Sequence, residues 1–174
     1  NLDSGIAADT AEGIADHLTT MMTDLRIPFL TLTEVGISDN DAAQRHFNNK
    51  IATKGYTCAW NLLTKKAKNT EARGCGVGIL YKSTLHRPEQ ICRHEAHRGI
   101  SADFIIPLRG KTHTLRILAI YGPQTLRRDE PLLNWLHPLI NPQGSDITVI
   151  LNGDLNSVID PAVDTASGLH ISHK

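Results

Sequence analysis

One stretch of the sequence brings a carboxylate and an amide together directly after an apolar run. Residues 147–151 are apolar and β-branched, and Asp154 and Asn156 follow two positions apart. Side chains two apart in a strand point to the same side, so this pair would project into one cleft. A carboxylate can accept a proton from a water that the amide orients, which suits hydrolysis. The alternative is a solvated turn, because Asn-Gly-Asp is ordinary turn composition.

Glu34 and Tyr121 also lie where apolar stretches end. Glu34 follows residues 29–33 and can bind magnesium, which takes hard oxygen donors and only one or two carboxylates beside water and phosphate oxygens. The alternative for Glu34 is a solvated side chain at a strand end. Tyr121 precedes Gly-Pro, and its alternative is a core aromatic residue whose hydroxyl is hydrogen-bonded at the rim.

Composition limits the class of protein. The chain has 174 residues, of which 40% are hydrophobic and 21% charged, as in one soluble globular domain. Lys plus Arg and Asp plus Glu are both 18, so any polyanion would have to bind at a local patch. No apolar run approaches the about 20 residues of a membrane span, and no signal peptide is evident, so we expect an intracellular protein. The cysteines Cys58, Cys75 and Cys92 are expected to be free thiols.

The order of apolar patterns predicts helices interleaved with strands. We expect helices over residues 9–25, 41–52 and from 129 onward, the first with Leu25 on its buried face and the last kinked or shortened by Pro138. We expect strands over residues 29–33, 56–63, 76–83 and 147–151, and a hairpin over 100–123 whose turn is Arg-Gly-Lys-Thr. Such an order indicates mixed sheets covered by helices.

Four blocks in this order resemble the endonuclease/exonuclease/phosphatase superfamily, the fold of pancreatic deoxyribonucleases and apurinic endonucleases. They are the strand-end glutamate and the segments GVGILY, RILAIYGP and VILNGDLN. The closer resemblance, through HRGISADFIIPLRGKTHTLRILAIYGP and GDLNSVIDPAVDT, is to the endonuclease domain of non-LTR retrotransposon polyproteins. It covers residues 1 to about 164. It implies an α/β (α+β) fold of two packed mixed β-sheets flanked by helices, a four-layer sandwich.

The resemblance assigns roles to matching residues. Glu34 corresponds to the family's metal-binding glutamate, and Asp154 and Asn156 to the pair that positions and activates the attacking water. Tyr121 corresponds to the tyrosine near the scissile phosphate. Asn1 matches the active-site asparagine that closes the family's first strand, although the alternative for it is a free chain end.

The sequence departs from the family at two points. Thr33 stands where the family usually has Gln before the glutamate. The family ends in a Ser-Asp-His segment whose histidine contacts the phosphate, and His170 and His173 follow Asp154 too closely to fill that role. We therefore expect residues 1–174 to form a single truncated domain, cut at both ends and incomplete at the C-terminus.

The implied function is hydrolysis of phosphodiesters, namely nicking of double-stranded DNA, with Mg²⁺ or alternatively Mn²⁺ as cofactor. Without the histidine we expect weak cleavage or none. The implied partners are DNA and a reverse transcriptase fused in the parent protein, with the nucleus as a location and no membrane association. Basic residues in two loops either contact DNA phosphates or are solvated surface: Lys65, Lys66, Lys68 and Arg73, and Arg127 and Arg128.

Two other functions stay open. The same scaffold hosts phosphatases and lipid phosphodiesterases, and fold alone does not decide the substrate. A lipid substrate would require exposed apolar loops near Tyr121, which the sequence does not predict. The second alternative is a non-catalytic remnant of a mobile element.

Overall fold

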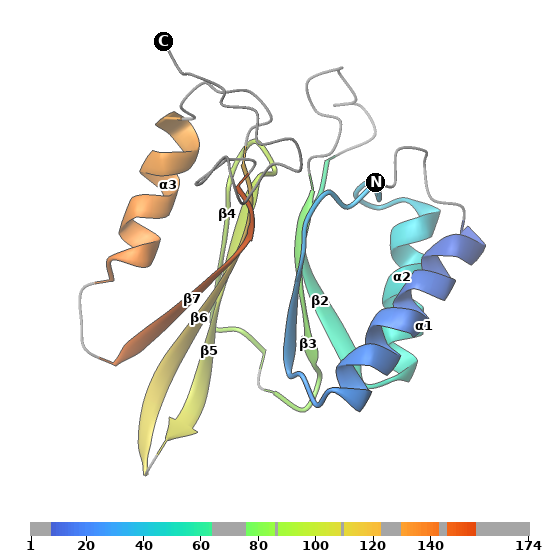
Figure 1. The fold of residues 1–174 in the computed structure, drawn as a ribbon, viewed down its shortest axis with the longest axis horizontal. Helices are drawn as coiled ribbons and strands as arrows, with labels where there is room; N and C mark the ends of the chain where they lie inside the picture. Colours follow the sequence, from blue (N-terminus) through green and yellow to red (C-terminus); the bar gives the residue numbers. More distant parts are fainter. Residues whose placement is uncertain are drawn as a thin grey trace, which may run out of the picture.

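Two β-sheets lie face to face in a computed structural model of the chain, and helices cover their outer sides (Figure 1). The structure describes residues 8–63, 76–85, 87–108, 110–122, 130–142 and 146–155. The elements follow in the order α1 (Ala8–Asp24), β1 (Phe29–Leu32), α2 (Ala42–Thr53), β2 (Tyr56–Asn61), β3 (Val77–Lys82), β4 (Gln90–Arg93), β5 (Gly99–Leu108), β6 (Lys111–Tyr121), α3 (Glu130–Ile140) and β7 (Ile147–Asp154). The predicted mixed α/β class is confirmed.

The two sheets differ in strand direction. The first has the order β1-β3-β2, and both of its described strand pairs are antiparallel. The second has the order β4-β5-β6-β7, and only its β6–β7 pair is parallel. The expectation of two mixed sheets therefore holds for the second sheet alone among the described strands. The predicted hairpin is β5–β6, with Leu108 opposite Lys111 at its turn.

Helices α1 and α2 pack on the outer face of the first sheet (Figure 1). The Asp41 side chain caps α2 by accepting a hydrogen bond from the Gln44 backbone N–H at 2.8 Å. Phe47 and Ile51 then point inward, as predicted, and are 2% and 1% exposed. Leu25 was predicted to be buried and is 64% exposed. The reason is that α1 ends at Asp24, so Leu25 no longer follows the helical face.

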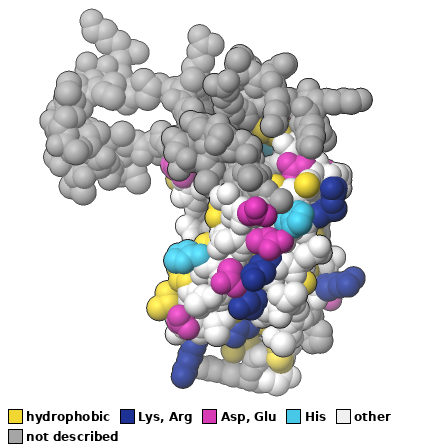
Figure 2. All heavy atoms as spheres, turned by 90° about the vertical axis from the view of Figure 1, so that its right-hand side faces the viewer, with side chains coloured by type: hydrophobic (Ala, Val, Ile, Leu, Met, Phe, Trp, Pro, Cys, Tyr) yellow, Lys and Arg dark blue, Asp and Glu magenta, His cyan; other side chains and the backbone are white. Residues whose placement is uncertain are grey.

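The exposed side of α1 and α2 carries charges of both signs. Figure 2 shows acidic, basic and histidine side chains close together on this face. Asp16 pairs with both Lys50 and Lys54, and Glu12 pairs with His46. Lys54 by its hydrogen bond, together with the charge of Lys50, lowers the pKa of the Asp16 carboxyl. Both lysines therefore share the Asp16 carboxylate, and this face carries charges of both signs.

A second core fills the space between the sheets. The buried residues come from β3, β5 and β6 above all, with Phe104 at the centre. Its ring meets Phe29 and Tyr81 edge-on, at centroid distances of 4.8 and 5.0 Å. This core fixes how the first sheet sits on the second, and with it the relative position of their strand ends.

Helix α3 covers the second sheet on its other face (Figure 1). Pro138 lies inside the helix, which continues to Ile140, so the helix does not stop at the proline, and the expected kink stays a prediction. Pro138 lies in the last turn, where it has no backbone N–H to donate to the carbonyl of Asn134, and the helix ends two residues later. Trp135 of α3 reaches the sheet at Gly99, where any larger side chain would meet the indole ring.

Strand β7 is the outermost strand of its sheet in the part of the chain that the structure describes. Ile150 and Leu151 are 46% and 43% exposed on it. Apolar side chains on an uncovered edge strand are a liability for self-association. None of the described helices combines the length and apolar character that a membrane crossing requires.

Asn61, at the end of β2, fixes the segment that leads into β5. Its side chain is buried, and its Nδ2 donates to the backbone oxygens of His94 and Gly99 at 2.7 and 2.8 Å. Its Oδ1 lies 3.0 Å from His97 Nδ1, so that nitrogen carries the proton. One buried amide thus ties the residues from His94 to Gly99 to the first sheet.

We expect Asn61→Ala to lower the free energy of unfolding by about 2 to 3 kcal/mol, because it removes three hydrogen bonds from a buried position. Urea unfolding followed by circular dichroism measures the change. Asn49→Ala is the matched control, because Asn49 is exposed on α2 and alanine favours the helix. Equal effects of the two substitutions would contradict this role of Asn61.

Candidate active site

Glu34 lies just beyond the end of β1, in an unusual backbone conformation. Its φ angle is 52°, in the left-handed region that residues other than glycine seldom adopt. The next residue, Val35, donates its backbone N–H to the Gly76 carbonyl, which ties the segment to the start of β3. Such local strain is frequent where a side chain must be held for function, and Glu34 is only partly buried.

Tyr121 and Asp154 are the last residues of two neighbouring parallel strands. They are register partners in the β6–β7 pair, so both lie at the carboxyl ends of their strands. The Gly122 backbone N–H donates to the Asp154 carbonyl at 2.6 Å and extends the pairing past the strand end. Asp154 is exposed, whereas Tyr121 is 1% exposed. The Asp154 carboxylate therefore reaches solvent, while its buried partner Tyr121 anchors the strand end beside it.

A hydrogen bond joins the two sheets at this end. The Tyr121 hydroxyl donates to Glu34 Oε1 at 2.5 Å, a short contact typical of a phenol and a carboxylate. Glu34 belongs to the first sheet and Tyr121 to the second, and their strand ends lie at the same end of the molecule (Figure 1). The structure thus brings together three of the predicted residues, Glu34, Tyr121 and Asp154, at one rim of the two sheets.

Arg98 is a neighbour of this rim that the sequence did not indicate. Its guanidinium carbon lies 5.7 Å from the centroid of the Tyr121 ring. Its Nη1 donates to the Gly122 carbonyl at 3.2 Å, and its own carbonyl accepts from the Tyr121 N–H. Arg98 therefore holds the end of β6 through both the ring and the backbone. Its only sequence signal was a place within the block that carried the resemblance.

Two of the predicted site residues, Asn1 and Asn156, lie outside the described residues. The same is true of both basic loops and of the two C-terminal histidines. Nothing is therefore added here to what the sequence predicts for them.

The donor set at the rim fits a hard divalent cation. Among the described residues, no group of three or more His, Cys, Asp or Glu side chains could hold a metal. Magnesium needs no such group, because it is usually bound by one or two carboxylates, with water and phosphate oxygens completing its shell. Glu34 offers a partly exposed carboxylate that a phenol orients, and Asp154, the register partner of Tyr121, offers a second, exposed one.

Comparison with known proteins supports the fold. No protein-family model matches the chain, and neither does any curated protein sequence. Solved structures do match. A humanized D. rerio TDP2 with 14 mutations is similar at a TM-score of 0.56 and 13% identity over 93% of this chain and 63% of that one. An endonuclease/exonuclease/phosphatase family protein from Leptotrichia buccalis C-1013-b is similar at 0.56 and 13%, over 97% and 67%.

A third similar structure is D. rerio TDP2 in complex with a single-strand DNA product, at a TM-score of 0.54 and 13% identity over 86% of this chain and 56% of that one. The chain spans less than two thirds of the length of these TDP2 structures. Identities this low show the fold alone. The chain thus shares the fold of these structures, and the residues that the structure describes form two sheets and three helices.

Proposed function

We propose that the chain is a metal-dependent phosphodiesterase that cleaves DNA at the rim formed by Glu34, Tyr121 and Asp154. The observation that supports this most is the Tyr121–Glu34 hydrogen bond, together with the register of Tyr121 and Asp154. The hydrogen bond joins, at one edge of the two sheets, residues that lie 87 positions apart in the sequence. A protein that shared only the fold of these nucleases would not need polar side chains to meet at this edge of the sheets.

In the proposed reaction, each side chain of the site has one role. Exposed Asp154 accepts a proton from the attacking water, which Asn156 orients. Glu34 would hold a magnesium ion, and Tyr121 fixes the Glu34 carboxylate through its hydroxyl hydrogen. When bound, the metal neutralises charge that develops on the phosphate. Arg98 keeps the Tyr121 ring in place.

The finer assignments follow the retrotransposon resemblance. We propose double-stranded DNA as the substrate, a reverse transcriptase fused in the parent protein, and a nuclear location. One similar protein was solved with single-strand DNA product, which is in keeping with a nucleic-acid substrate. We also propose that residues 1–174 form one domain and part of a four-layer sandwich. Residues 155–174 contain no Ser-Asp-His segment, and a positioned acid or base contributes about 100- to 10,000-fold in rate, so we expect residues 1–174 by themselves to nick DNA weakly.

Plasmid nicking tests the proposal, with magnesium or with a chelator. We expect slow conversion of supercoiled to open-circular DNA that requires the metal, and a loss of about 100-fold or more in Glu34→Gln and in Asp154→Asn. Asp24→Asn is the matched control, because Asp24 is exposed at the far end of α1. Cleavage that resists the chelator and survives both rim substitutions would show that the assignment is wrong. No cleavage at high enzyme concentration would favour the non-catalytic remnant.

The lipid phosphodiesterase alternative has one observation in its favour. Leu155 is 48% exposed and directly follows Asp154. A lipid substrate would use apolar surface at the rim, and the sequence had not predicted any there. Hydrolysis of phosphatidylinositol vesicles, measured beside plasmid nicking under the same magnesium concentration, separates the two functions.

A further inference from the structure

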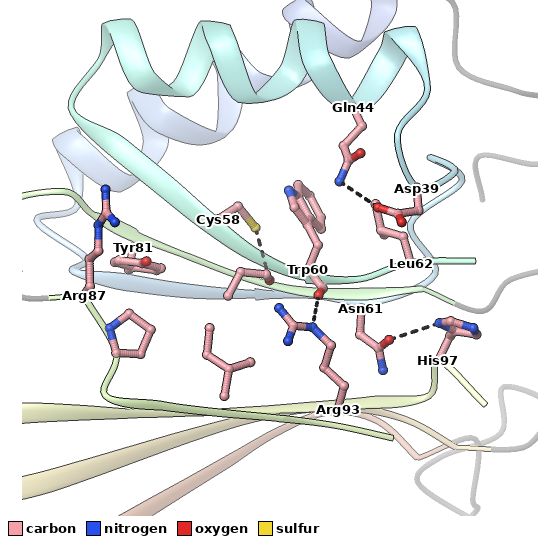
Figure 3. A pocket seen from close by; sticks show the side chains of 13 residues that line it. Asp39, Gln44, Cys58, Trp60, Asn61, Leu62, Tyr81, Arg87, Arg93 and His97 are labelled. Carbon is pink, nitrogen blue, oxygen red and sulfur yellow. Dashed lines mark hydrogen bonds between the residues drawn. The ribbon is translucent and has the colours of Figure 1, made fainter. Parts of the chain in front are cut away.

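A groove of about 620 Å³ lies between the edges of the two sheets, apart from the rim (Figure 3). Its floor is formed by β2, from Cys58 to Asn61, and by Leu62 and Tyr81. One wall is formed by the segment before and along β4, which contributes Arg87, Ile91 and Arg93. The groove belongs to strand edges that the proposed reaction does not use.

Basic side chains are spread along this groove. Figure 3 shows Arg87 near one end, Arg93 in the middle and His97 near the other end. Both arginines are exposed, and neither forms an ion pair within the part of the chain that the structure describes. Arginine side chains without a carboxylate partner are suited to phosphate oxygens, which they bind with two parallel N–H donors.

One carboxylate lines the groove, and it is engaged. Asp39 accepts hydrogen bonds from Asn40 at 3.0 Å and from Gln44 at 3.4 Å. Two further carboxylates, Glu89 and Glu95, are exposed in the same segment as the arginines but do not line the groove. The lining therefore carries two permanent positive charges against one negative charge.

The strand edges do not favour an added peptide strand. Arg93 Nε donates to the Trp60 carbonyl at 2.8 Å, and thereby occupies an acceptor that a peptide would pair with. The Asn61 amide bridges from β2 to the carbonyls of His94 and Gly99. Trp60 and Tyr81 are also only 9% and 5% exposed, so neither residue offers a ring face for stacking. What remains for recognition is the pair of arginines, Arg87 and Arg93.

We propose that this groove holds the phosphodiester backbone of a single nucleic-acid strand, with Arg87 and Arg93 contacting phosphates. Its spread-out cations suit a linear polyanion better than one small phosphate ligand. The inference rests on the proposed function for the identity of the strand as DNA. Because no aromatic ring of the groove stacks on the bases, we expect the strand to be bound through its phosphates and without sequence preference.

The groove leads toward the rim. The His97 carbonyl accepts a hydrogen bond from the Gly76 N–H, and the Gly76 carbonyl accepts one from Val35. Val35 is the neighbour of Glu34, so two backbone hydrogen bonds separate the His97 end of the groove from the rim segment. A strand held along Arg87 and Arg93 would leave the groove beside the proposed site of cleavage.

Fluorescence anisotropy with a labelled oligothymidylate of about 12 nucleotides, in chelator so that nothing is cleaved, tests the inference. We expect Arg87→Gln/Arg93→Gln to weaken binding about tenfold or more and to reduce the salt dependence, the slope of log K against log salt, by about 1.4, or about 0.7 per phosphate contact. Lys50→Gln/Lys54→Gln is the charge-matched control on α2, and should bind like the wild type. Equal weakening in both pairs would overturn the inference.

Two further arms keep the result decisive. Arg87→Gln alone leaves the Arg93–Trp60 contact intact, so about half of the slope change is expected even if the double variant unfolds. Competition with thymidine monophosphate distinguishes a site for a nucleic-acid backbone from a site for a small phosphate ligand. Displacement of the oligonucleotide at equal phosphate concentration would show a small-ligand site and overturn the inference. If the chain nicks DNA and the arginine variants bind the oligonucleotide normally, the inference is wrong and the proposed function stands. If the arginine variants bind weakly and the wild type does not nick DNA, the inference stands and the proposed function is wrong.

Discussion

Gly153→Ala is expected to lower the free energy of unfolding by about 3 kcal/mol or more, and to abolish any activity of the rim. Gly153 has a φ angle of 154°, and a Cβ atom there would overlap the backbone oxygen of Ile120. Ile120 is its register partner on β6, so the clash falls on backbone that no side-chain rotation can move. Relief requires β6 and β7 to separate beside Tyr121 and Asp154.

Gly13→Ala is the matched control for this prediction. Gly13 lies inside α1, and a Cβ atom there would meet nothing within 4 Å. The same substitution should therefore stabilise the chain by up to about 1 kcal/mol, because alanine favours a helix over glycine. Urea midpoints that move in opposite directions support this account of Gly153. Midpoints that move together would mean that the β6–β7 pair tolerates a wider spacing.

The parts of the fold that the sequence predicted correctly are those with local signals. The hairpin from Gly99 to Tyr121 combines an apolar alternation with a turn that contains glycine. Helix α2 was predicted to within a residue at each end, because Asp41 supplies a cap and Phe47 and Ile51 share one face. Local chemistry and tertiary packing agree at these positions.

Three of the five candidate site residues are brought together because each ends a strand. Glu34, Tyr121 and Asp154 follow apolar runs, and carboxyl ends of strands in packed sheets gather at shared edges. Sequence pattern thus predicted that these residues lie at strand ends. Their order along the chain matched the superfamily. The sequence pattern did not predict the contact of Tyr121 with Glu34, because that contact depends on how one sheet packs on the other.

The residues that the sequence missed act across long separations. Asn61 interrupts an apolar run, which is a signal for a buried amide, but its acceptors lie more than thirty residues away. Arg98 looked like any surface cation. Strand β4 is four residues long and has a polar and a charged residue at its ends, which is too short a pattern to be read as a strand.

The second large effect is expected at the Asp103–Arg116 pair beneath α3. These residues are register partners on β5 and β6, and each side chain is 11% exposed. Arg116 Nε and Nη2 donate to the two carboxylate oxygens at 2.7 Å, and Nη1 donates to the Leu139 carbonyl at 3.1 Å. The hydrogen bond that Arg116 donates to Asp103 raises the pKa of the guanidinium. The guanidinium therefore stays charged through neutral pH, and its contribution is lost only as the pH rises through the raised pKa.

Arg116→Met should lower the free energy of unfolding by about 3 kcal/mol, because it leaves the Asp103 carboxylate nearly buried without its partner. The double variant Asp103→Leu/Arg116→Met should recover most of that loss, since apolar residues of similar volume remove the stranded charge. Lys54→Met provides the contrast, because its pair with Asp16 is exposed, and the urea midpoint should not move measurably. A double variant as unstable as Arg116→Met would show that the Leu139 contact, and not the ion pair, joins α3 to the sheet. In that case the helix would be held by its backbone, and the carboxylate would serve only to orient the arginine.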